Sequence, residues 1–141
     1  MTRREDDERG DVTRETVTVR VPPTASNLVV LRTAVSGIAA RDNFTLEQVD
    51  DLRMAVEEAG IQLLRRSDSD HLTMEVTATD SGVEIRLAAD IRAEDPVLDE
   101  TSFSWRILQA LADELHVETE HGRAVIVLTK HRLLARRQEE A

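Results

Sequence analysis

The chain has 141 residues, a formal net charge of -10 and no cysteine. This length predicts one domain that can bury a core without staples, and the missing cysteines exclude disulfides, thiolate catalysis and cysteine-based zinc sites. An acidic chain is a poor nucleic-acid binder, because contacts to phosphate need clustered Lys and Arg, but it suits a basic protein partner.

Residues 1–14 are almost all charged or polar, so they cannot bury enough apolar area to offset the entropy of ordering. We expect a disordered tail here, a single folded domain over 15–131 and a C-terminal tail over 132–141. The start lacks the apolar segment of a secretory signal, and no apolar run approaches the roughly 20 residues of a membrane span. The sequence therefore predicts a cytoplasmic protein that does not enter a membrane.

The first two expected elements are a strand and a helix. Polar and apolar residues alternate over 16–21, which predicts a strand that ends before Pro22. Apolar residues then recur three or four apart over 25–43, which predicts an amphipathic helix. The hydroxyl of Thr24 or Ser26 is expected to cap its start.

A second helix is expected over 45–66. Thr45 and Gln48 have the three-residue spacing of a capping box. The apolar stripe of this helix consists of Leu46, Val49, Leu52, Val56, Ala59 and Leu63.

The rest of the chain predicts two hairpins around a third helix. Alternation over 72–78 and 83–89 indicates the first hairpin, and the acidic segment 91–101 reads as a loop. A helix follows over 102–115, and the second hairpin covers 116–130. The element order is then β-α-α-β-β-α-β-β. This order favours an α+β two-layer sandwich: a mostly antiparallel mixed sheet with three helices on one face.

The second helix places two adjacent carboxylates, Glu57 and Glu58, beside its apolar stripe. Gln62 lies four residues after Glu58, so this amide and this carboxylate share one helix face, one turn apart. Such a pair could activate a nucleophile and hold a metal ion. It could equally be the solvated side of an ordinary helix, and the spacing alone leaves both interpretations open.

The element order, with "DDLRMAVEEAGIQ" (50–62) on the second helix, resembles the histidine-kinase-like ATPase superfamily. More narrowly it resembles the anti-sigma factor and serine-protein kinase family, and "SFSWRILQALADEL" (102–115) is similar to its actinobacterial, mycobacterial anti-sigma-F type. The resemblance covers residues 16–130. A family motif, Glu-x-x-x-Asn, implies a general base at Glu58 and a magnesium ligand at Gln62. The extra methylene of glutamine weakens this ligand, because Mg²⁺ demands near-ideal octahedral geometry.

Two further motifs of this family bind ATP, and both are altered here. In the Asp-x-Gly-x-Gly motif the resemblance assigns adenine recognition to Asp90, but Arg92 and Glu94 stand where the glycines let backbone approach the nucleotide. The lid segment contains no glycine to cradle phosphate. We expect Phe103 or Trp105 to fill the space of the lost pocket.

Arg32, on the first expected helix, stands where family members carry an arginine that contacts an acidic residue of a sigma factor. The alternative is a surface arginine whose stem covers apolar atoms. The resemblance also implies the partners: an alternative sigma factor, an anti-anti-sigma protein of the sulfate-transporter-like (STAS) regulatory family, and a second copy of this chain through the first helix.

Three hypotheses follow. The leading one is an anti-sigma factor that sequesters an alternative, stress-type sigma factor, is released by anti-anti-sigma proteins, and has a degraded ATP site with weak or no kinase activity. The second is an active ATP-dependent serine kinase that phosphorylates its anti-anti-sigma antagonist, with ATP and Mg²⁺ as cofactors. The third is a domain that shares only the fold.

Overall fold

The computed structural model describes residues 15–92 and 98–133. The expected tail over 1–14 and most of the expected tail over 132–141 lie outside the described residues. The described strands are β1 (Thr16–Val21), β2 (Leu72–Ala78), β3 (Gly82–Asp90), β4 (Glu114–Glu120) and β5 (Arg123–His131), and the helices are α2 (Leu28–Arg41), α3 (Leu46–Arg66) and α4 (Phe103–Leu111), with a 3₁₀ turn η1 (Ala25–Asn27) before α2. Within these residues, no helix combines the length and the apolar character that a membrane crossing requires.

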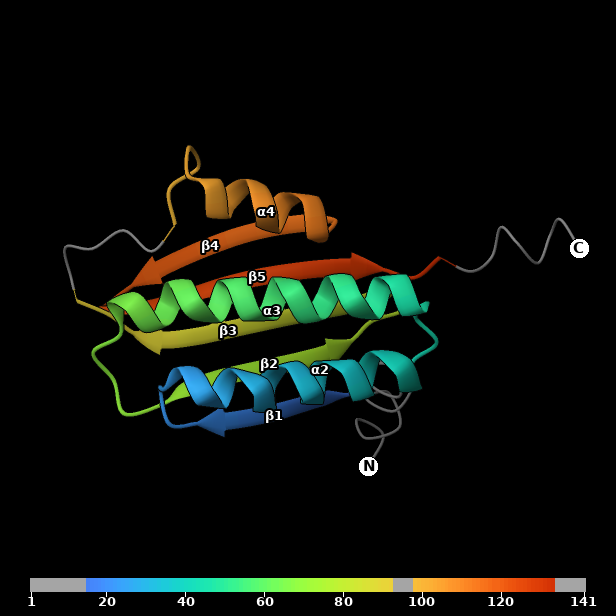
Figure 1. Cartoon of the computed structure of the whole chain (residues 1–141), viewed down its shortest axis with the longest axis horizontal. Coiled ribbons are helices and arrows are strands. Elements are labelled where there is room, and N and C mark those ends of the chain that lie inside the picture. The colour runs from blue at the N-terminus through green and yellow to red at the C-terminus, as the bar shows by residue number, and fades with distance from the viewer. Residues whose placement is uncertain (1–14, 93–97, 134–141) are drawn as a thin grey trace, which may run out of the picture.

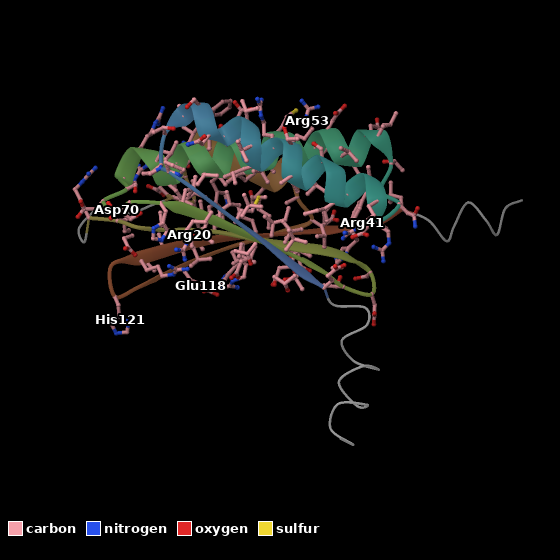
Figure 2. The ribbon with its side chains drawn as sticks, turned by 90° about the horizontal axis from the view of Figure 1, so that it is seen from below. Arg20, Arg41, Arg53, Asp70, Glu118 and His121 are labelled. Atoms are coloured by element: carbon pink, nitrogen blue, oxygen red, sulfur yellow. The ribbon has the colours of Figure 1, made fainter. Side chains whose placement is uncertain are left out.

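The five strands form one sheet in the order β1-β2-β3-β5-β4, and all four pairings are antiparallel. The three helices lie side by side against one face, with α2 near β1 and β2, α3 in the middle and α4 near β4 (Figure 1). In the edge-on view α2 and α3 form one layer and the sheet forms the other (Figure 2). The expected α+β sandwich is therefore confirmed.

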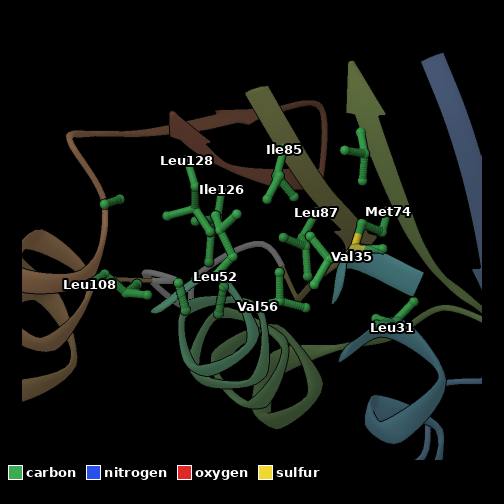
Figure 3. Close-up of a cluster of buried hydrophobic side chains, with 14 of the residues drawn as sticks. Leu31, Val35, Leu52, Val56, Met74, Ile85, Leu87, Leu108, Ile126 and Leu128 are labelled. Atoms are coloured by element: carbon green, nitrogen blue, oxygen red, sulfur yellow. The ribbon is translucent and has the colours of Figure 1, made fainter. Parts of the chain in front are cut away.

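The core lies between the helices and the sheet and is almost entirely aliphatic. Leu52 and Val56 of α3 face Ile85, Leu87 and Ile126 of the strands, and all five side chains have no exposed surface (Figure 3). Burial of one such side chain contributes about 1.5–3 kcal/mol. This packing fixes α3 along the middle of the sheet, so its polar residues are presented to α2 and α4.

The start of α3 is held by the predicted capping box. Thr45 Oγ1 accepts a hydrogen bond from Gln48 N at 3.1 Å, and Thr45 N donates to Gln48 Oε1 at 3.2 Å. The same glutamine donates from Nε2 to the carbonyl of His131 at 2.6 Å. The cap therefore also ties α3 to the end of β5.

The predicted cap of the first helix is not formed. The chain passes through η1, and α2 begins at Leu28 without a side-chain cap. The Thr24 and Ser26 hydroxyls lie 3.2 Å apart, and Asn27 Nδ2 donates to Thr24 Oγ1 at 3.1 Å. These hydroxyls serve the turn itself, so they do not reach the helix N–H groups.

The third helix ends earlier than expected, at Leu111 and not at residue 115. Ala112 takes an extended conformation with ψ of 158°, and Asp113 N donates to the Thr129 carbonyl at 2.8 Å. The chain thus joins β5 at once, and β4 begins at Glu114. The end of α4 is therefore set by pairing with a neighbouring strand, and the spacing of apolar residues along a helix carries no information about such pairing.

Lys130, on β5, is a buried charge between two helices, with 8% of its surface exposed. Its Nζ donates to the Leu111 carbonyl at 2.7 Å and to Asp51 Oδ2 at 3.2 Å. A cation next to the last carbonyls of α4 is also favoured by the helix dipole. Lys130 thus holds the C-terminal end of α4 to α3 and to the sheet.

Candidate functional site

The adjacent carboxylates of Glu57 and Glu58 point to different helices. Glu57 Oε1 accepts a hydrogen bond from Arg32 Nη1 of α2 at 3.0 Å. Glu58 Oε2 accepts one from Ser104 Oγ of α4 at 2.5 Å. Successive residues of a helix project about 100° apart, so these two side chains do not form one acid–base pair.

Glu58, Gln62 and Ser104 form one hydrogen-bonded group between α3 and α4. Gln62 Nε2 donates to Glu58 Oε2 at 3.2 Å and to Ser104 Oγ at 2.8 Å. The structure thus brings the two motif residues of α3 together, as their spacing predicted. Ser104 was missed, because it lies 46 residues from Glu58 and nothing in the local sequence marks it.

The amide oxygen of Gln62, the expected magnesium ligand, faces an arginine. Arg66 Nη1 donates to Gln62 Oε1 and to the Gln62 carbonyl, both at 3.2 Å. The oxygen and nitrogen of this amide cannot be exchanged. The Arg66 guanidinium only donates, so it needs the amide oxygen, and the Glu58 carboxylate only accepts, so it needs the amide nitrogen. A fixed positive charge at this oxygen opposes a divalent cation, so these residues do not fit Mg²⁺. Among the described residues, no group of three or more His, Asp or Glu could hold a metal either.

Arg92, which replaces a glycine of the nucleotide motif, covers the end of α3. Its backbone N–H donates to the Arg66 carbonyl at 3.3 Å, and its Nη2 donates to the Arg65 carbonyl at 3.1 Å. A cation at a helix C-terminus is stabilising, so this arginine has a structural role where the family has open backbone. Glu94, the second replacement, lies outside the described residues.

Asp90 is not brought together with Glu58. Side chains alternate along β3: Leu87 and Ala89 belong to the core under the helices, whereas Arg86 and Asp90 line a hollow on the other face of the sheet. This is the face that carries the labelled side chain of Glu118 (Figure 2). Adenine recognition by Asp90 therefore stays a prediction, and it lacks the neighbours that a shared nucleotide site would need.

The expectation for the aromatic residues of α4 fails for Phe103 and stays a prediction for Trp105. Phe103 is 75% exposed, so the expectation that it fills a lost pocket is wrong. Trp105 is partly exposed, and the helix packs into the core through Leu108, which is fully buried. The small residue between the two aromatics, Ser104, is the one that reaches α3.

Arg32 lies in the groove between α2 and α3. It pairs with Glu57, and the side chains of the two residues are 29% and 41% exposed. Both residues line a surface hollow with Met54, which is 52% exposed, and with the ion pair Arg53–Asp50. The hollow therefore combines exposed apolar surface with partly exposed ion pairs, whose charged groups could bind a partner protein instead of each other.

Comparison with known proteins gives relatives of one kind. The chain is 35% identical over 106 residues to the anti-sigma-F factor RsbW of Mycobacterium tuberculosis (strain H37Rv). The match covers 74% of this chain and 61% of that protein, so the chain spans less than two thirds of the length of this relative. It is also 22% identical to the serine-protein kinase RsbW of Bacillus cereus (strain G9842), over 83% of this chain and 85% of that protein. No protein-family model matches the chain.

The fold has a solved counterpart. This chain superposes on part of the crystal structure of the RsbU and RsbW domains of Rv1364c from Mycobacterium tuberculosis, with a TM-score of 0.68 and 13% identity. The match covers 84% of this chain and 32% of that one. At this identity the likeness shows the fold alone. Together with the sequence relatives, it confirms the resemblance to the anti-sigma factor and serine-protein kinase family with its ATPase-like fold.

Proposed function

We propose that this chain, as a relative of the RsbW anti-sigma factors and serine-protein kinases, is a cytoplasmic anti-sigma factor. Its domain, which we place at residues 15–131, would hold an alternative, stress-type sigma factor away from RNA polymerase until an anti-anti-sigma protein of the STAS family competes for it. One observation favours binding over catalysis: Glu58 and Gln62 are already engaged by Ser104 and Arg66 of the same chain.

The proposed sigma-binding surface is the outer side of α2 and α3. Arg32 provides a cation that can leave Glu57 for a partner carboxylate, because the pair is partly exposed and therefore weak. Val29 and Val30 on α2 and Met54 on α3 are about half exposed, at 50%, 45% and 52%. They would supply the apolar centre that an interface needs. The net charge of -10 would speed encounter with a basic partner.

A homodimer through the α2 region is part of this proposal. The two exposed valines on α2 support it, because they lie in adjacent positions near the start of the helix. The family resemblance motivates the dimer, and the same apolar surface would have to be shared between the second copy and the sigma factor. Sedimentation of the free chain and of the complex would establish the stoichiometry.

A serine kinase is the second candidate, and the name of the Bacillus relatives motivates it. In that function Glu58 would be the base, Gln62 would bind Mg²⁺ and Asp90 would bind the adenine of ATP. The Arg66 guanidinium at Gln62 and the position of Asp90 on the other face of the sheet both disfavour it.

The deciding experiment combines partner capture with nucleotide binding. Affinity capture from the native lysate, followed by mass spectrometry, should return a sigma factor, and the purified pair should inhibit transcription that depends on this sigma factor. Calorimetry with Mg-ATP should show no saturable heat. Failure to retain any sigma factor at stoichiometric level contradicts the binding proposal. Transfer of phosphate to a partner serine that depends on Glu58 would establish the kinase instead.

A matched pair of variants tests the surface. Arg32→Glu should lose the sigma factor, whereas Arg20→Glu should retain it. Arg20 is an exposed arginine of β1, away from the α2–α3 groove (Figure 2). Equal loss in both variants would mean that total charge, and not this groove, governs binding.

A further inference from the structure

Ser104, in the first turn of α4, joins this helix to α3. Its hydroxyl donates to Glu58 Oε2 at 2.5 Å and accepts from Gln62 Nε2 at 2.8 Å. These bonds fix the direction of the proton, because the carboxylate only accepts and the amide nitrogen only donates. Arg66 in turn holds the amide oxygen of Gln62, which aims its NH₂ group at the other two side chains.

This geometry is that of a phosphate acceptor on its general base. Before phosphoryl transfer, the base accepts a hydrogen bond from the hydroxyl whose oxygen will attack phosphorus. In this chain the hydroxyl is supplied by α4 of the same molecule. A serine from another protein that needed Glu58 Oε2 would first have to displace Ser104.

We propose that Ser104 is an internal occupant of the acceptor position at Glu58, which withdraws this carboxylate from proton transfer and fastens α4 to α3. The inference rests on Glu58 as the inherited base of the family, the role that the serine-kinase alternative gives to it under the proposed function. It does not depend on sigma-factor binding, and no phosphate transfer to Ser104 is part of it.

The fold keeps α4 in place at other points too, so the contact can be removed without loss of the helix. Ser102 caps α4 by accepting a hydrogen bond from Trp105 N at 3.1 Å. Lys130 donates to the Leu111 carbonyl at the other end at 2.7 Å. Ser102 and Ser104 lie in the same turn, but only Ser104 touches Glu58, which makes Ser102 the matched control.

The test measures the chemical reactivity of Glu58. The full chain is treated with a water-soluble carbodiimide and glycine ethyl ester at one mildly acidic pH, and amide formation is quantified by peptide mass spectrometry. Glu57 lies in the same tryptic peptide and serves as the internal reference, since Arg53 and Arg65 bound this peptide. In Ser104→Ala we expect the Glu58-to-Glu57 labelling ratio to rise about tenfold, because a hydrogen bond to a charged group is lost.

Two controls separate occupancy from general loosening of α4. Ser104→Thr keeps the hydroxyl and should retain the wild-type ratio. Ser102→Ala weakens the cap without touching Glu58 and should also retain it. An unchanged ratio in Ser104→Ala, or an equal rise in Ser102→Ala, overturns the proposal. If Ser104→Ala does not fold, Ser104→Cys takes its place, since a thiol keeps the volume but donates weakly. Sigma-factor capture by the same variants is scored separately, so failure of this inference and failure of the proposed function are distinguishable.

Discussion

Charge exchange between Arg32 and Glu57 can separate a role in binding from a role in the fold. Arg32→Glu places two carboxylates at a site where Nη1 and Oε1 are now 3.0 Å apart. With side chains 29% and 41% exposed, water screens the pair, and it contributes about 0.5 kcal/mol. Loss of this attraction plus like-charge repulsion should lower the free energy of unfolding by about 1 kcal/mol. For a domain of this size this is roughly 4 °C in Tm.

The effect on a sigma-factor complex should be larger. If Arg32 meets a partner carboxylate in a desolvated interface, its reversal should cost about 3 kcal/mol, which is two orders of magnitude in Kd. The double variant Arg32→Glu with Glu57→Arg restores the intramolecular pair in reversed orientation. We therefore expect its Tm to return close to wild type while its Kd stays weak.

Differential scanning calorimetry and titration calorimetry on the same protein samples give both quantities. Arg20→Glu, on a different part of the surface, controls for the change in net charge. Recovery of sigma binding in the double variant would refute the reasoning. It would mean that Arg32 acts by holding α2 to α3. The partner would then recognise the shape of the groove, and the positive charge at position 32 would not contribute to binding.

Three further predictions concern the polar ties inside the domain. Lys130→Met should lower the free energy of unfolding by about 1–2 kcal/mol in urea titration, because the Leu111 carbonyl loses its donor while Asp51, which is 38% exposed, stays solvated. A loss above roughly 4 kcal/mol would mean that the Asp51 carboxylate is left buried without a hydrogen-bond partner. Gln62→Asn should not produce detectable Mg-ATP binding in calorimetry, because Arg66 still opposes a divalent cation; a saturable heat would contradict the misfit described for this site. Thr45→Ala should cost about 1 kcal/mol and leave partner binding unchanged, because it removes only the acceptor of the Gln48 N–H at the start of α3. Equal stability would show that water satisfies this N–H as well as the Thr45 hydroxyl does.

The helices and strands were predictable where local patterns act alone. The capping box at Thr45 and Gln48 and the two hairpins follow from spacing and alternation, which are properties of a short stretch of chain. The end of α4 was not predictable in this way. Asp113 leaves the helix because Thr129, 16 positions further along the chain, offers a backbone acceptor in the sheet.

The candidate site was predictable only on α3. Spacing placed Glu58 and Gln62 on one face, but their partner Ser104 comes from another helix, and Arg66 turned a potential ligand into a hydrogen-bond acceptor for a guanidinium. Asp90 shows the complementary limit. A motif fixes its position along β3, but the alternation of the strand decides which face of the sheet it joins.

The burial of Lys130 has a practical consequence for chemical work on this protein. It is the only lysine in the sequence, and its amine is packed between α3 and α4. Amine-directed reagents will therefore react slowly with the only lysine side chain of these 141 residues. Such reagents will also leave the α2–α3 groove unmodified, because none of the residues that line it is a lysine. Amine cross-linkers, for the same reason, will report poorly on any complex that forms there.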